Sequence, residues 1–167
     1  MVYLIMFRRA RRFSFVAIMT RLKRTTSEDV DFQTLVKLLD HELATRDGDE
    51  HSFYAAFNKT ADIKHVVVYY HGDKPVGCGA FKPYDEKTVE IKRMFVLPEL
   101  RGKGIAAVVL KELELWAAEL NYTACILETG KKQPEAIRLY QRVGYRLVPN
   151  YGQYAEVVNS ICMRKEI

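Results

Sequence analysis

Two glycines flanked by basic residues stand directly before a helical pattern, in the stretch Arg101-Gly102-Lys103-Gly104-Ile105-Ala106. The N–H groups of a helix's first turn lack partners within the helix and carry a partial positive charge, so they favour anions such as phosphate. Gly102 and Gly104 lack the Cβ atoms that would hold a diphosphate away from these groups. Arg101 and Lys103 would add positive charge from the rim. The stretch predicts a phosphate-binding turn, with an ordinary turn before a helix as the alternative.

Two other phosphate-binding motifs share parts of this pattern. A P-loop requires Ser or Thr directly after Gly-Lys, whereas Gly104 follows Lys103. A dinucleotide-binding fingerprint fits the spacing of Gly102, Gly104 and Ala107. That fingerprint begins directly at the end of an apolar strand, but here the residues LPELR intervene after Val96. The sequence context therefore disfavours both motifs.

Three segments in order resemble the GNAT acetyltransferase superfamily. Its signature is an Arg or Gln, two residues, a Gly, one residue, and a Gly or Ala, which Arg101, Gly104 and Ala106 match. The preceding VEIKRMFV and the later PEAIRLYQRVGY also resemble the family's patterns. The resemblance extends from about residue 19 to the end. It implies an α/β fold with a mixed, mostly antiparallel twisted sheet of about six or seven strands flanked by about four helices. The two central strands, here 88–96 and 123–129, would splay apart in a V.

The resemblance also implies acetyl-CoA as the co-substrate and no metal. The diphosphate would lie on the N–H groups of residues 101–106, and a backbone N–H near Phe95 or Val96 would bind the thioester oxygen. Gln133 stands where the family usually has Asn. The residues implied in cofactor binding are Phe95, Val96, Arg101, Gly102, Lys103, Gly104, Ile105, Ala106, Gln133, Ala136 and Tyr140.

Acetyl transfer from a thioester to an amine needs a neutral amine and a proton for the departing thiolate. Tyr140 shares a helix face with Ala136, and its phenol could act as the acid. A packed core tyrosine is the alternative. Glu90 stands where some family members carry a catalytic base that acts through water. The alternative for Glu90 is an ion pair with Lys92 on a solvated strand face.

In this family the first two helices and the loop between the last strands select the acceptor. Acidic and aromatic side chains there would suit a cationic amine, although a run such as RDGDE is more typical of a solvated loop. We expect a primary amine of a small molecule or a peptide. The candidate acceptor-binding residues are His41, Phe53, Tyr54, Glu128, Tyr151 and Tyr154. A non-catalytic CoA-binding domain that serves as a sensor or scaffold is the second hypothesis.

The hydrophobic periodicity predicts the elements that must position these residues. Short runs rich in apolar and β-branched residues indicate strands, and spacings of three and four indicate helices. Predicted strands are 14–22, 65–70, 76–84, 88–96, 123–128, 145–148 and 157–165, and predicted helices are 32–46, 51–58, the segment after Gly104, and 134–143. Within strand 88–96, alternation would place Glu90, Lys92 and Met94 on one face and Arg93 and Phe95 on the other.

The 167 residues suit one domain, and the net charge of +5 comes from one end of the chain. The first 24 residues carry seven basic side chains and no acid, so the remainder has a slight excess of acids. We predict a basic extension over 1–18 and a single domain over 19–167, with Met19 as an alternative natural start. Binding of nucleic acid through the basic extension is the weaker hypothesis.

The cysteine spacing and the hydropathy indicate where in the cell the protein is expected. Cys78, Cys125 and Cys162 are widely spaced and form no CxxC, which argues against a disulfide framework or a zinc site. Reduced thiols are typical of the cytoplasm, which is the expected location. No segment approaches the roughly 20 apolar residues of a membrane span. A homodimer is one possible assembly.

Overall fold

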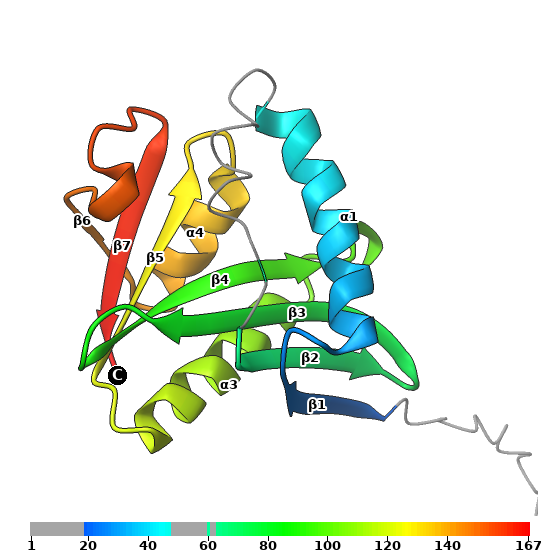
Figure 1. The fold of residues 1–167 in the computed structure, drawn as a ribbon. Coiled ribbons are helices and arrows are strands. Elements are labelled where there is room, and N and C mark those ends of the chain that lie inside the picture. The colour runs from blue at the N-terminus through cyan, green and yellow to red at the C-terminus, as the bar shows by residue number, and fades with distance from the viewer. Residues whose placement is uncertain (1–18, 48–59, 61–62) are drawn as a thin grey trace, which may run out of the picture.

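Seven strands form one twisted sheet in the order β1-β2-β3-β4-β5-β7-β6 (Figure 1). The computed structural model describes residues 19–47, 60 and 63–167. All neighbouring strands are antiparallel except β4 and β5, which confirms the predicted mixed sheet. The strands are β1 Thr20–Thr25, β2 His65–His71, β3 Lys74–Pro83, β4 Thr88–Val96, β5 Ala124–Gly130, β6 Arg146–Val148 and β7 Ser160–Glu166.

The described residues contain three α-helices, where the sequence predicted about four. These are α1 Val30–Asp47, α3 Ile105–Glu119 and α4 Pro134–Arg142, with two short 3-10 helices at Pro98–Leu100 and Gly152–Tyr154. The predicted helix 51–58 lies outside the described residues, as does the extension 1–18. α1 and α3 cover opposite faces of the sheet (Figure 1).

α1 begins at Val30 because Asp29 caps it. The Asp29 carboxylate accepts hydrogen bonds from the backbone N–H groups of Asp31 (2.9 Å) and Phe32 (3.0 Å), which satisfies two of the unpaired donors of the first turn. The buried side chains then follow helical spacing and pack on the sheet. They are Phe32, Leu35, Val36 and Leu39.

The first strand differs from the sequence prediction. Residues 14–18 of the predicted strand 14–22 lie outside the described residues, and β1 runs from Thr20 to Thr25, three residues past the predicted end, and pairs with β2 along its whole length. β1 lies at the edge of the sheet, where one side of the ladder is open and charged side chains are common. The basic residues of β1 do not form an apolar pattern, and the strand is instead defined by its backbone pairing with β2.

The parallel pair β4–β5 opens part of the way along the sheet. Pairing runs from Thr88 opposite Ala124 to Glu90 opposite Ile126 and then stops, although β4 continues to Val96 and β5 to Gly130. This confirms the V-shaped splay between the two central strands.

A bulge in β4 lies where the two strands separate. Ala80 of β3 pairs with Lys92 and Cys78 pairs with Phe95, so Arg93 and Met94 together oppose the single residue Gly79. Arg93 has a φ of 58°, in the left-handed region that non-glycine residues rarely adopt. A bulge of this kind bends a strand and increases its twist, which carries β4 away from β5.

The bulge also overturns the predicted side-chain alternation in β4. A Cβ atom on Gly79 would lie 2.4 Å from the Met94 sulfur and 2.9 Å from Leu113 of α3, so Met94 faces α3. Arg93 instead forms an ion pair with Asp40 of α1. Lys92 shares the α1 face with Ala80, its cross-strand partner. Two consecutive residues, Lys92 and Arg93, therefore lie on the same face of the sheet.

Candidate functional site

A cleft of about 570 Å³ runs between the end of β4, the N-terminus of α3, and helices α1 and α4. We call it the outer cleft. Ten of the eleven residues that the sequence assigned to cofactor binding line it, and the exception is Lys103, which is exposed outside the lining. The ten are Phe95, Val96, Arg101, Gly102, Gly104, Ile105, Ala106, Gln133, Ala136 and Tyr140.

The N-terminus of α3 opens into this cleft without a side-chain cap. Gly104 is the N-cap residue, with a φ of 82°, and no side chain hydrogen-bonds to the first turn. A Cβ atom on Gly104 would have no neighbour within 4 Å, so empty space lies directly against the backbone. The first N–H groups of α3 thus face a cradle that a larger residue would fill, and this arrangement fits a diphosphate.

Arg101 is held by the protein rather than standing free at the rim as expected. Its Nε donates to the backbone oxygen of Val96 (2.9 Å), and its guanidinium binds both carboxylate oxygens of Glu42. Glu42 also pairs with Arg46, which in turn pairs with Glu135 of α4. This network joins α1, the glycine loop and α4 across the outer cleft, so Glu42 offsets the charge of Arg101.

The same contact orients the backbone of Val96. Its carbonyl oxygen accepts from Arg101, and the next residue, Leu97, donates its N–H to Val76 of β3 (2.9 Å). In an antiparallel ladder the N–H and C=O of one residue point to the same side. The Val96 N–H therefore points away from β3, toward the open side of β4.

A smaller chamber of about 100 Å³ lies between the splayed strands. We call it the inner chamber. Four consecutive residues of β4, Ile91 to Met94, form one wall, and Glu128 to Gly130 of β5 form another. Five residues line both the inner chamber and the outer cleft, so the two spaces adjoin. These are Leu39, Leu43, Met94, Gln133 and Tyr140.

Tyr140 lies at this junction and is 6% exposed. Its ring packs edge-on against Tyr145, with ring centroids 5.7 Å apart. Burial, together with the negative charge of Glu128, raises the pKa of the Tyr140 phenol above its ordinary value. The hydroxyl therefore stays protonated at neutral pH and can donate a hydrogen bond or a proton.

Glu90 is buried in a charged cluster behind the chamber wall. Only 2% of it is exposed, and it lies in the lining of neither space. Its carboxylate lies 3.5 Å from the Lys92 ammonium and 3.3 Å from that of Lys82, and it accepts from the Tyr151 hydroxyl (3.4 Å). The predicted alternative is right about the ion pair with Lys92 and wrong about the solvated strand face, because both side chains are buried.

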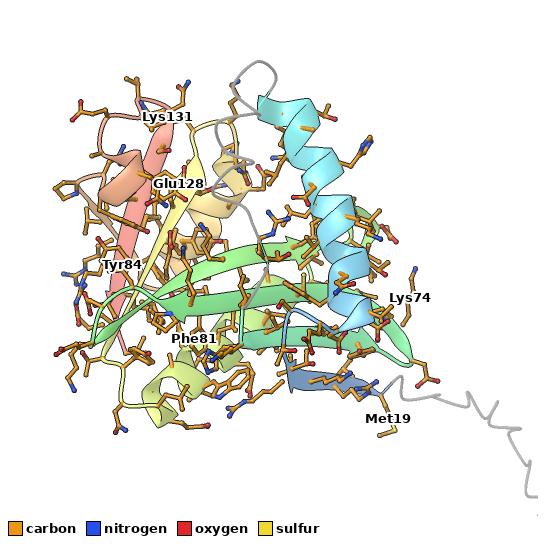
Figure 2. All side chains as sticks on the ribbon, in the orientation of Figure 1. Met19, Lys74, Phe81, Tyr84, Glu128 and Lys131 are labelled. Atoms are coloured by element: carbon orange, nitrogen blue, oxygen red, sulfur yellow. The ribbon has the colours of Figure 1, made fainter. Side chains whose placement is uncertain are left out.

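The six acceptor-binding candidates separate into different places. Glu128 lines the inner chamber and accepts from the Ser160 hydroxyl (2.6 Å); Figure 2 shows it on the part of β5 beyond the strand separation. Tyr151 and Tyr154 pack against each other behind Lys92, which donates to the Tyr154 hydroxyl (3.1 Å). His41 is exposed on α1, away from both linings. Phe53 and Tyr54 lie outside the described residues.

Lys92 and Arg93 line the inner chamber, and the sequence did not single them out as binding residues. Their signal was two adjacent basic side chains inside a predicted strand that also holds Val89, Ile91, Met94, Phe95 and Val96. Charged residues are rarely buried unless they are paired or functional.

The three cysteines are buried, free thiols that line neither the outer cleft nor the inner chamber. Burial raises the pKa of Cys78 and of Cys125 to about 12, so neither is a thiolate near neutral pH. We expect a thiol reagent at pH 8 to label the native protein slowly and the urea-unfolded protein at all three cysteines. Rapid labelling of the native protein would contradict this packing.

Within the described part of the chain, no group of three or more His, Cys, Asp or Glu side chains is placed to hold a metal ion. None of the described helices combines the length and the hydropathy that a membrane crossing requires.

Comparisons with known proteins agree with this geometry. An IAA acetyltransferase of Azospirillum brasilense is 36% identical over 107 residues, which cover 64% of this chain and 69% of the relative. A solved acyl-CoA N-acyltransferase candidate from Klebsiella pneumoniae has a TM-score of 0.75 at 27% identity, covering 89% of this chain and 98% of that one. Across the first curated relatives the chain spans 48–69% of their length.

A third similarity concerns a bound ligand. The PaiA N-acetyltransferase of Thermoplasma acidophilum, solved in complex with coenzyme A, shares the fold with a TM-score of 0.67 at 15% identity, over 89% of this chain and 99% of that one. The model of the acetyltransferase (GNAT) family matches residues 32–145, which include the β4 bulge, the glycine loop and Tyr140. On the family match and the splayed sheet together, this chain belongs to the acetyltransferase (GNAT) family.

Proposed function

We propose that the protein is an N-acetyltransferase that moves an acetyl group from acetyl-CoA to a primary amine of a small molecule or peptide. The observation that carries the proposal is the continuity of the two spaces. The outer cleft ends at an uncapped helix N-terminus and meets the inner chamber at Tyr140. A long anionic donor in the cleft would thus bring its reactive end to the place where an acceptor can enter.

The chain offers a residue for each requirement of the reaction. The N–H groups at the start of α3 would bind the diphosphate, and the Val96 N–H would bind the thioester oxygen as negative charge develops on it. The neutral amine attacks the carbonyl carbon, and a tetrahedral intermediate forms. Its collapse breaks the C–S bond, and the Tyr140 hydroxyl supplies the proton that the sulfur takes up.

Glu128 is the better placed group to take the amine's proton. It lines the inner chamber, whereas Glu90, expected in this role from the sequence, lies behind Lys92. A general base must come within hydrogen-bond reach of the proton, directly or through one water. Among the described residues paired with Glu90, Lys92 lines the chamber, so Glu90 would act through Lys92.

Replacing Glu128 by Gln is expected to flatten the acidic limb of the pH profile of kcat/KM. A carboxylate works as a base only when it is ionised, so the wild-type rate rises with pH through its titration, and the amide lacks that dependence. The matched variant is Glu90→Gln, which removes a carboxylate outside the chamber and should keep the limb. If Glu90→Gln alone loses the limb, Glu90 is the base.

The competing function is a CoA-binding domain without turnover. Free-thiol release from acetyl-CoA, measured with a panel of amines beside calorimetric CoA binding, separates the two. Release that depends on the amine supports the enzyme, and tight binding without release supports the sensor. Binding of nucleic acid through residues 1–18 would instead weaken steeply with salt and vanish when they are deleted.

The location proposed is the cytoplasm, because all three cysteines are free and buried in a fold that needs no disulfide.

A further inference from the structure

The inner chamber has a wall with positive side chains. The β4 bulge places Lys92 and Arg93 on the same sheet face, and both line the chamber. In a regular strand one of the two would point to the opposite face. The left-handed backbone at Arg93 is energetically unfavourable for a residue with a Cβ atom, so the fold maintains this pairing of cations at some cost.

Arg93 retains hydrogen-bonding capacity that the described residues do not use. Its side chain is 2% exposed, and one terminal nitrogen binds Asp40, a half-exposed residue of α1. Among the described residues, the Nε N–H is buried and has no acceptor. A guanidinium carries five N–H donors and is matched in shape to a carboxylate, which can accept two of them.

Lys92 has only a long ion pair with a protein carboxylate among the described residues. Its side chain is 8% exposed, and its nearest carboxylate is Glu90 at 3.5 Å, a long distance for a charge-assisted hydrogen bond. The other carboxylate oxygen of Glu90 pairs with Lys82 at 3.3 Å. Two cations therefore share one buried carboxylate, which leaves Lys92 able to bind a further anion.

Opposite charge lines the facing strand of the splay, because Glu128 of β5 is part of the same chamber. We propose that the acceptor is an amine that also carries a carboxylate, as a free amino acid does. Its carboxylate binds Arg93 and Lys92, and its amino group lies toward Glu128. The proposal rests on the acetyltransferase function and names its substrate class. A plain alkylamine could place its ammonium near Glu128 but would bring no carboxylate to Arg93 and Lys92.

The test compares acceptors that differ only at the carboxylate. Glycine, L-alanine, L-methionine and L-phenylalanine are each measured beside the corresponding carboxamide, which also imitates a peptide amine. Calorimetry gives binding to the CoA-loaded protein, and free-thiol release gives turnover with acetyl-CoA. We expect at least one amino acid to bind at least about tenfold more tightly than its amide, because a charge-assisted hydrogen-bond pair is lost.

Variants locate the binding group. Arg93→Gln should reduce the preference for the carboxylate to within about threefold and leave the amide's affinity nearly unchanged, since only charge-assisted contacts are removed. Asp40→Asn is the matched control, because it breaks the same ion pair without altering the chamber and should keep the preference. Equal loss in both variants would show that Arg93 acts through Asp40, and it would overturn the assignment.

The outcomes for substrate class and for function are separate. Turnover with equal or better use of the amides overturns the carboxylate proposal and leaves the acetyltransferase function standing, with a peptide or simple amine as acceptor. Carboxylate-selective binding without turnover supports the proposed substrate class and overturns the enzyme. The comparison of acid and amide on the wild-type protein needs no variant, so a variant that fails to fold does not affect it.

Discussion

Gly104→Ala is expected to weaken binding of CoA by about a hundredfold while the protein stays folded. The added methyl group would occupy the space directly in front of the α3 N-terminus, where a Cβ atom meets no protein atom within 4 Å. A diphosphate would be held away from the first N–H groups of the helix. Losing one or two hydrogen bonds to a charged ligand, at about 1.5–3 kcal/mol each, corresponds to a decrease of this size.

Gly72→Ala provides the matched control for backbone strain. Gly72 lies in the β2–β3 hairpin with a φ of 60°, and a Cβ atom there also has no neighbour within 4 Å. Both substitutions place a methyl group on a left-handed residue and should cost about 1–2 kcal/mol of stability. Calorimetric CoA titration and urea unfolding of both variants test this. Equal CoA affinity in Gly104→Ala and the wild type would place the diphosphate elsewhere.

Tyr140→Phe is expected to lower kcat by about tenfold to a thousandfold, with little change in CoA affinity. The phenol lies at the junction of the two spaces and keeps its proton at neutral pH, so its loss removes the acid for the thiolate. The ring itself is retained, so its packing against Tyr145 persists. Steady-state kinetics with the best acceptor of the amine panel provide the measurement.

Tyr145→Phe tests whether the effect belongs to that hydroxyl. Tyr145 is equally buried and adjacent to Tyr140, yet it lines neither the outer cleft nor the inner chamber. Its variant should turn over at the wild-type rate. Wild-type turnover in Tyr140→Phe would reduce Tyr140 to a packed core residue, the alternative that the sequence left open.

The pH dependence follows from the direction of the Tyr140 shift. Burial raises the pKa of the phenol, so the protonated donor persists above the ordinary tyrosine range near 10. We therefore expect no alkaline loss of kcat below about pH 10 in the wild type. A descending limb there that Tyr140→Phe abolishes would contradict the raised pKa.

Several features were predictable because they are local in the sequence. The glycine loop, the helix after it and the strands of the meander depend on short-range spacing and turn residues, and the described elements agree with their predicted bounds within three residues outside β1. The resemblance to the family pattern rests on residues that lie close together in the chain. Ten of the eleven cofactor candidates line the outer cleft for this reason.

The charges of the site were decided by pairings between distant segments. Arg101 is neutralised by Glu42, 59 residues earlier, and Arg93 pairs with Asp40, 53 residues earlier. No local pattern specifies such contacts, because they depend on how α1 packs over the sheet. The prediction from sequence therefore took Arg101 as an unpaired cation at the rim and did not include Arg93 among the binding residues.

The sequence by itself determined a splayed α/β sheet, an uncapped glycine-lined helix N-terminus and a tyrosine on the facing helix. Tertiary structure alone decided which charged side chains reach the chamber. One extra residue opposite Gly79 reverses the alternation of β4 and turns Arg93 toward the same face as Lys92, so that both cations line the chamber. The physical reason is that strand periodicity fixes side-chain faces only while the ladder is regular, and a bulge is a property of two strands together.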